Sequence, residues 1–178
     1  MASGRDHDRA TLLGCTPFGL ALTPWLGLDA GVIGAGAFVV GGLWLSPDLD
    51  TFSKPLQRWG PLRWLWWPYR RLIPHRSLFS HGPLIGMTLR LLWVLVWVLV
   101  GWMLLSWALE LLMGMPTVNP SAWAIQVRQS AQAHPHLLWA TGLGLEASVW
   151  LHLVLDGDPM PVEWQRRRRR RHRRSPRR

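Results

Sequence analysis

The feature that most constrains the fold of this chain is the long apolar run between Arg90 and Glu110. Residues 91–109 carry no charged side chain and consist mainly of leucine, valine and tryptophan. A helix over this run is long enough to cross the hydrocarbon core of a bilayer. The arginine and the glutamate that flank it can extend their charged ends toward the headgroups. The sequence therefore predicts a membrane-spanning helix within residues 83–113.

Three other stretches are almost as apolar. They cover residues 12–28, which Pro17 and Pro24 interrupt, and residues 30–46 and 137–156. We expect an all-α, multi-span membrane protein with about four hydrophobic helices. The 30–46 stretch is rich in glycine, which destabilises a helix in water but allows helices to approach closely in a membrane.

Composition agrees with this class. Hydrophobic residues make up 49% of the 178 residues, charged residues only 17%, and there are 14 tryptophans. Soluble domains usually carry about a quarter charged residues. A chain of this length is expected to form one domain, which we place at residues 1–160. An arginine-rich tail, residues 161–178, is expected to be disordered.

The tail carries most of the net charge of +10. Half of the 20 basic residues lie within residues 166–178, and the chain without this run is formally neutral. A run of this kind is either a solvated charge segment or a binding segment for anionic lipid headgroups or RNA. Lipid is favoured if the body is embedded in a membrane. A nucleic-acid role has no support, because no aromatic residues alternate with the arginines to stack on bases.

Residues 51–76 differ from the apolar stretches. Basic residues recur among tryptophans, and four prolines exclude one long helix. This pattern is typical of a segment at the membrane interface, although a soluble loop over the core is an alternative. Residues 114–136 are expected to form a polar loop with one basic residue.

Charge distribution predicts the topology. Basic residues concentrate in cytoplasmic loops, which places residues 51–76 and the tail inside and residues 114–136 outside. Four spans with both termini in the cytoplasm satisfy this rule. The arrangement brings four short polar motifs to the same membrane face: "GRDHD", "SPDLD", "HRSLFSH" and "HLVLD".

Each motif alone has an ordinary structural explanation. "SPDLD" is typical of a helix end followed by a turn, and His152 and Asp156 share one helix face, as a buried hydrogen-bonded pair would. Together they indicate more, because ionisable groups in membrane segments are costly and usually functional. Imidazole and carboxylate are ligands of zinc in catalytic sites, and manganese or iron is also possible. We therefore favour a metal site over a purely structural polar network.

The order of these motifs resembles a small family of uncharacterised bacterial proteins known only as metal-binding. It is also distantly similar to the bacterial membrane-bound metal-dependent hydrolases, one branch of which is LexA-regulated, and through them to zinc-dependent phospholipase C, a helical fold. The resemblance implies a bacterial inner-membrane location and a divalent ion, with zinc preferred. It implies these ligands: His7, Asp48, His75, His81, His152 and Asp156.

The resulting hypothesis is metal-dependent hydrolysis of a phosphorylated or lipid-like substrate at the cytoplasmic face. Asp48 and His75 would be central ligands, and Asp50 or Glu146 would act as general base. Arg76 would hold a phosphate group, or would merely balance charge at the interface. Two alternatives remain: a metal-binding membrane protein without catalysis, and a tether to anionic lipid or RNA through the tail. Membrane lipids are the expected partners, and the sequence does not determine the oligomeric state.

Overall fold

The computed structural model describes residues 3–114 and 120–157. Over these residues the chain is helical and contains no strand, which confirms the all-α prediction. The predicted tail, residues 161–178, and the domain boundary before it lie outside the described residues.

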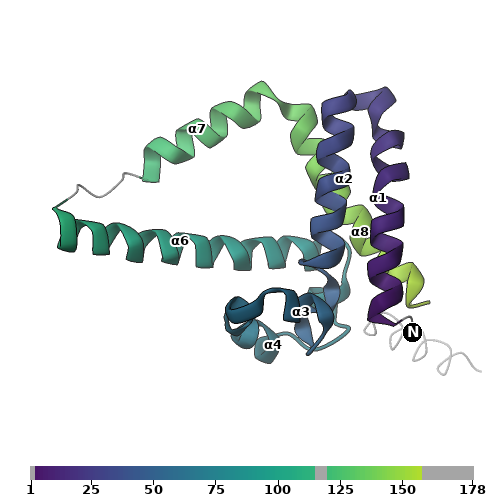
Figure 1. Cartoon of the computed structure of the whole chain (residues 1–178), viewed down its shortest axis with the longest axis horizontal. Helices are drawn as coiled ribbons and strands as arrows, with labels where there is room; N and C mark the ends of the chain where they lie inside the picture. The colour runs from purple at the N-terminus through teal and green to yellow at the C-terminus, as the bar shows by residue number, and fades with distance from the viewer. Residues whose placement is uncertain (1–2, 115–119, 158–178) are drawn as a thin grey trace, which may run out of the picture.

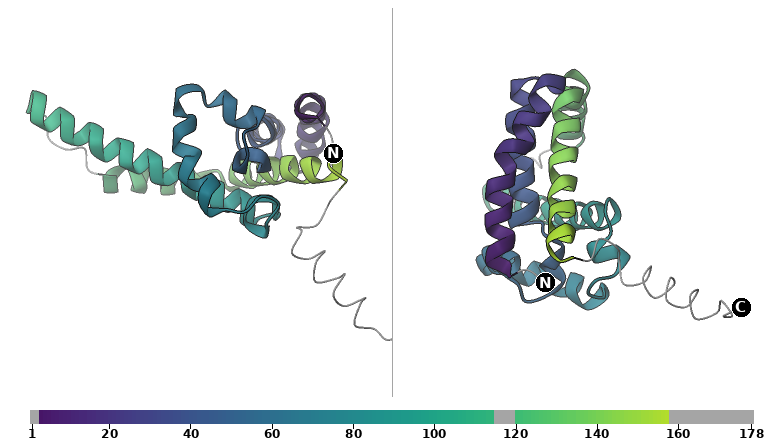
Figure 2. Two further views of the ribbon diagram at one scale, coloured as in Figure 1. Left: turned by 90° about the horizontal axis from the view of Figure 1, so that it is seen from below. Right: turned by 90° about the vertical axis from the view of Figure 1, so that its right-hand side faces the viewer.

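Three long helices form a bundle: α1 (Gly4–Leu26), α2 (Leu28–Leu43) and α8 (Pro135–Leu155). Figures 1 and 2 show them side by side, with α2 antiparallel to α1 after a turn at Gly27, whose φ is 94°. Pro17 and Pro24, which interrupt the apolar stretch of residues 12–28, both lie inside α1, and the helix is continuous through them. Packing against α2 supports α1 along its length, and Gly19 of α1 lies against the backbone of Gly31 in α2.

Glycines set the spacing between α2 and α8. A Cβ atom placed on Gly144 of α8 would collide with the carbonyl oxygen of Gly34 and would lie 3.0 Å from the Cβ of Ala37. A Cβ on Gly41 would lie 3.1 Å from the carbonyl oxygen of Leu145. The close approach expected from the glycine-rich sequence is therefore present.

Short helices follow α2 and form a layer at one end of the bundle (Figure 1). They are η1 (Pro47–Asp50), α3 (Lys54–Arg58), η2 (Gly60–Trp66), α4 (Trp67–Leu72) and α5 (Leu78–His81). Proline stands in the first turn of η1, α3, η2 and α4, which confirms that residues 51–76 do not form one long helix.

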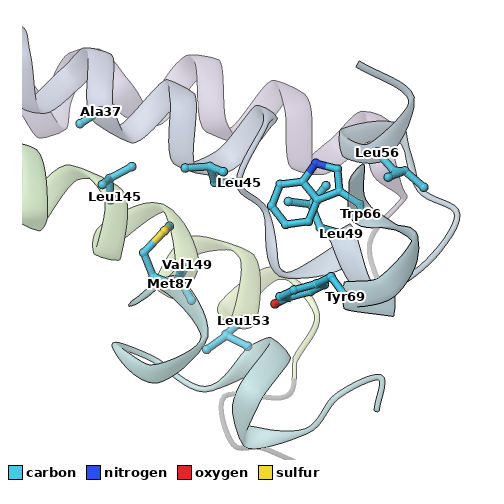
Figure 3. Packing of buried hydrophobic residues seen from close by; sticks show 10 residues of the cluster. All are labelled: Ala37, Leu45, Leu49, Leu56, Trp66, Tyr69, Met87, Leu145, Val149 and Leu153. Carbon is cyan, nitrogen blue, oxygen red and sulfur yellow. The ribbon is translucent and has the colours of Figure 1, made fainter. Parts of the chain in front are cut away.

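The hydrophobic core lies where this layer meets the bundle. Figure 3 shows Leu49, Trp66 and Tyr69 from the short helices facing Val149 and Leu153 of α8, and all five are nearly or fully inaccessible to solvent. The Trp66 and Tyr69 rings meet edge to face, with centroids 5.3 Å apart. The core therefore fixes the ends of α2 and α8 to the layer of short helices, close to the polar motifs.

Helix α6 (Ile85–Met113) leaves the layer sideways, and α7 (Pro120–Ala133) leads back to the start of α8 (Figures 1 and 2). Only the first turns of α6 pack on the layer, where Trp93 Nε1 donates to the carbonyl oxygen of Leu65 at 3.0 Å. The Trp97 ring of α6 also meets the Trp64 ring of η2, with centroids 5.4 Å apart. This differs from four spans side by side, because α6 extends away from the bundle beyond these contacts (Figure 1).

Helix α7 also corrects the expectation of a loop over residues 114–136. Alanine and glutamine, which are good helix formers, alternate with the polar and apolar residues of this segment. Proline suits the first turn of a helix, where α7 has Pro120. The lack of a long apolar run excluded a span, but it did not exclude a helix.

Three helical segments are long and apolar enough to cross a membrane: residues 28–50, α6 and α8. The predicted first span, residues 12–28, is not among them within the described part of the chain. It forms part of α1, where threonine, proline and glycine dilute the apolar side chains. Over residues 3–114 and 120–157 the number of candidate spans is thus three and not four.

Candidate metal centre

The start of α1 positions the first candidate ligand. Ser3 caps the helix by accepting from the backbone N–H of Asp6 at 3.3 Å, and the Asp6 carboxylate accepts from the backbone N–H of Ser3 at 2.9 Å. This capping box fixes the first turn. His7 follows directly and points into the protein, and only 8% of its surface is exposed.

The "PDLD" turn supplies two carboxylates. Leu49 is buried in the core. Asp48 and Asp50, on either side of it, face His152 of α8 and His81 of α5. The hydroxyls of Thr51 and Ser53 donate to the carbonyl oxygen of Asp48 at 3.0 Å and 2.8 Å and stabilise the turn. The Asp50 side chain is fully buried.

The "HRSLFSH" motif folds around α5. Ser77 caps this short helix, and the Ser80 hydroxyl contacts the carbonyl oxygen of Pro74 at 3.2 Å and the Nδ1 of His81 at 2.9 Å. His81 is buried, whereas the side chain of His75 is 41% exposed. The motif thus presents one interior and one peripheral imidazole.

The end of α8 supplies the last pair. His152 and Asp156 are one turn apart, with Nε2 and Oδ2 separated by 3.7 Å. The Nδ1 of His152 lies 3.4 Å from the hydroxyl of Ser46, which directly precedes η1. The serine thereby fixes which nitrogen of His152 faces the carboxylates.

The structure brings all six predicted ligands, together with Asp50, into one cluster. The carboxylates lie between the imidazoles. Asp156 Oδ1 is 3.3 Å from His7 Nε2, and Asp48 Oδ1 is 3.5 Å from His152 Nε2.

The cluster continues toward α5. Asp48 Oδ1 is 3.7 Å from His81 Nε2, and Asp50 is 3.6 Å from His81 Nδ1 and 2.9 Å from His75 Nδ1. Three overlapping trios have donor atoms close enough to share an ion: His7, His152 and Asp156; Asp48, His81 and His152; Asp50, His75 and His81.

Unsatisfied atoms within the cluster indicate what it could bind. The Nε2 atoms of His81 and His152 and the Oδ2 of Asp50 are buried and have no hydrogen-bond partner. Buried polar atoms are rarely left in this state. Two other pairs of the cluster are hydrogen-bonded, His7 with Asp156 and His75 with Asp50. The three unpartnered atoms fit a divalent cation, which takes lone pairs from imidazole nitrogens and carboxylate oxygens.

Electrostatics also favours a neutral His7. Burial lowers the pKa of His7 below its usual 6.5, and the neighbouring His152 lowers it further, although Asp156 acts in the opposite direction. The His7 and His152 rings are stacked, with centroids 4.0 Å apart. A neutral imidazole is the form that binds a metal.

The three residues suggested for catalysis have different surroundings. Asp50 lies within the cluster, between two imidazoles. Arg76 lies at its edge, with Nη2 3.9 Å from Asp156 Oδ2. Glu146 is not in any of the trios, and its carboxylate accepts from the backbone N–H of Leu84 at 2.8 Å, directly before α6.

Sequence reasoning missed three contributors. Ser46 and Ser80 contact the ring nitrogens of His152 and His81, and their places inside "SPDLD" and "HRSLFSH" were the available signal. Arg90, expected to extend outward, is instead fully buried and donates to the carbonyl oxygen of Ser80 at 2.6 Å.

Comparison with known proteins identifies a relative in Aquifex aeolicus (strain VF5), an uncharacterized protein. It is 41% identical over 58 residues, which cover 32% of this chain and 40% of the relative. The chain thus spans less than half of the length of that relative. No solved structure matches the chain. A family match covers residues 2–168, nearly the whole sequence, and with it every residue of the cluster. This chain belongs to the uncharacterized metal-binding protein family DUF2227.

Proposed function

We propose that this protein is a membrane-embedded metal-binding protein whose cluster at the end of the bundle holds a divalent cation. The observation that carries the proposal is the set of buried, unpartnered donor atoms on His81, His152 and Asp50. They come from three elements distant in sequence, and a structural polar network would have paired them. Membership of a metal-binding family supports the same conclusion.

Zinc is the ion that best fits this donor set. Four imidazoles and three carboxylates surround the site, and zinc accepts both donor types. Manganese and iron accept them as well. Cys15, the one cysteine of the chain, is a free thiol that contacts the carbonyl oxygen of Leu12. A thiolate-rich site is therefore not part of the proposal.

Membrane embedding is supported by the helices themselves. The apolar windows of residues 28–50 and of α8 are only partly covered, and no residue in that of α6 is buried. Leucine, valine and tryptophan side chains along α6 are exposed, among them Leu99, Leu104 and Trp107. A lipid environment would remove this apolar surface from water. The cluster would then lie near the cytoplasmic headgroups, as the basic residues of the α3–α4 layer indicate.

The finer proposal is that the centre hydrolyses a phosphoester of an amphiphilic substrate. When bound, a divalent ion lowers the pKa of a coordinated water and polarises a phosphoryl oxygen. Arg76, at the edge of the cluster, would bind a phosphate oxygen. Asp50 lies between His75 and His81, and we assign it the role of a ligand in place of general base. The Glu146 carboxylate accepts from the backbone N–H of Leu84, directly before α6, and we assign it no chemical role.

A non-catalytic metal-binding role is the second candidate. The burial of the His81 and His152 side chains, each 5% exposed, favours it. Access to the centre runs past Asp48 and His75, whose side chains are 27% and 41% exposed. Only an activity measurement separates the two candidates.

The test uses full-length protein purified in detergent. Elemental analysis should find zinc, manganese or iron in the wild type, much less in His81→Ala, and the wild-type amount in His136→Ala. His136 is a suitable control because it pairs with Asp29 at the other end of the bundle, at 3.0 Å. Equal metal content in all three proteins would overturn the proposal.

Hydrolysis is tested on the same preparations. The metal-loaded wild type should cleave a phosphodiester or phospholipid substrate, and Asp48→Ala should not. Metal-loaded protein without any such activity would favour the non-catalytic role.

A further inference from the structure

The seven cluster residues are arranged in a row and do not surround a single point. Along it the ring centroids of successive histidines are 4.0 Å apart for His7 and His152, 5.9 Å for His152 and His81, and 5.1 Å for His81 and His75. One carboxylate lies between each successive pair of imidazoles. Asp156 lies between the first two, Asp48 between the middle two, and Asp50 between the last two.

A single ion cannot use the whole row. Nitrogen and oxygen ligands lie about 2.0–2.2 Å from zinc, so donors of one ion are within about 4.4 Å of each other. Within each of the three trios the donor atoms lie within 4.8 Å of one another. No trio contains both His7 and His75. Four ligands complete a tetrahedral zinc site, whereas seven candidate ligands are present.

The three trios cannot all be filled independently. The middle trio, with Asp48, shares His152 with one end trio and His81 with the other. The same nitrogen of His152, Nε2, faces both Asp48 and Asp156. The two end trios share no residue, so they are the pair that can be filled together.

We propose that the cluster holds two divalent ions, one in the trio of His7, His152 and Asp156 and the other in the trio of Asp50, His75 and His81. The Asp48 carboxylate lies between them as the shared ligand. This inference rests on the proposed metal-binding function and extends it. Pairs of close divalent ions are typical of sites that clamp a phosphoryl group between two cations. A phosphate ester is therefore the substrate class that a two-ion centre here would take.

The two positions differ in access. The side chains of His7, His152 and Asp156 are at most 10% exposed, whereas His75 in the other trio is 41% exposed. The ion held by His75 should therefore exchange faster and be removed first by a chelator. The ion held by His7 should remain longer.

The experiment is a titration of metal-free, detergent-solubilised full-length protein with Mn²⁺, followed by elemental analysis after removal of unbound ion. The wild type should bind two ions per chain. His7→Ala and His75→Ala should each bind one, and the control His136→Ala should bind two. In the two-ion wild type, electron paramagnetic resonance should show the exchange-coupled spectrum of a close manganese pair. Asp48→Ala should weaken that coupling.

The outcomes are distinguishable. One ion per chain in the wild type would overturn the two-ion centre but leave the metal-binding function intact. No bound ion would overturn the function itself. Two ions in the wild type without magnetic coupling would show that they lie apart and would also contradict the proposal. Because stoichiometry and coupling are measured on the wild type, the test does not depend on the variants folding.

Discussion

At the residue scale, the centre depends on imidazoles held in a defined orientation. Ser46 contacts Nδ1 of His152, whose Nε2 faces Asp48 and Asp156. Nδ1 of His81 faces Ser80 and Asp50, and its Nε2 faces Asp48. Such outer contacts fix the tautomer and ring position of a metal ligand. In the proposed function, the ligands would therefore be arranged before an ion binds.

The pH dependence of the metal-free protein follows from His7. Its pKa is lowered in the folded state by burial and by His152, so the folded protein binds a proton there less readily than the unfolded chain, whose pKa is about 6.5. Proton uptake then favours unfolding as pH falls. The melting temperature of the metal-free protein should be constant above about pH 7 and should fall below about pH 6.5.

His7→Gln should reduce this dependence, because glutamine does not titrate in that range. Differential scanning fluorimetry between pH 5 and pH 8 checks the prediction. A melting temperature that falls equally in the wild type and in His7→Gln would contradict it.

The site was more predictable than its surroundings. Charged and imidazole side chains stand out in an otherwise apolar chain, and their places at the ends of the apolar stretches predicted that they lie close together, as they do. The burial of Arg90 was not predictable. The chain turns at Leu84, where φ is 60°, and α6 then begins against α5, so that Arg90 donates to the carbonyl oxygen of Ser80. No local pattern of the sequence encodes that turn.

At the element scale, the spacing of α2 and α8 positions the centre, since one helix leads into Asp48 and the other carries His152. The glycine pattern predicted close packing but not its partners. The helix over α7 was missed because its polar residues were interpreted as a loop, although the alanines and glutamines of this segment favour a helix.

Gly144 tests this spacing. Gly144→Ala would direct a methyl group at the backbone of Gly34 and at the Cβ of Ala37. Overpacking of this kind costs about 1–3 kcal/mol. Gly142 lies on the same helix, and a Cβ added there would meet nothing within 4 Å. Gly142→Ala is therefore a matched control, and it should be neutral or slightly stabilising, since alanine is the better helix former.

Thermal unfolding of the two variants in detergent checks the prediction. The Gly144 variant should unfold at a lower temperature than the wild type. Equal melting temperatures for both variants would show that the α2–α8 contact is looser than described.

At the scale of the whole molecule, α6 is the most apolar and the least covered of the three candidate spans. The bundle, the layer of short helices and the cluster form one body, and α6 extends away from it (Figure 1). In the proposed function α6 lies in lipid, so a charge in its middle should be costly, and a charge at its end should not.

Leu99→Arg and Met113→Arg test the membrane assignment. Both positions are exposed, and they lie near the middle and at the end of α6. An arginine at the centre of a membrane helix costs about 2.5–3.5 kcal/mol on insertion scales, and much less near the interface. Leu99→Arg should reduce the fraction of protein recovered in membranes, and Met113→Arg should not. Equal recovery of both variants would argue against insertion of α6.

The most direct test of the central claim is X-ray absorption spectroscopy of the zinc-loaded full-length protein. The cluster predicts a shell of nitrogen and oxygen atoms at about 2.0–2.2 Å, with the scattering pattern of imidazole rings and without sulfur. His81→Ala should lose part of the imidazole signal. A zinc ion surrounded only by water oxygens, or bound by sulfur at about 2.3 Å, would contradict the assignment of these histidines and aspartates as the metal centre.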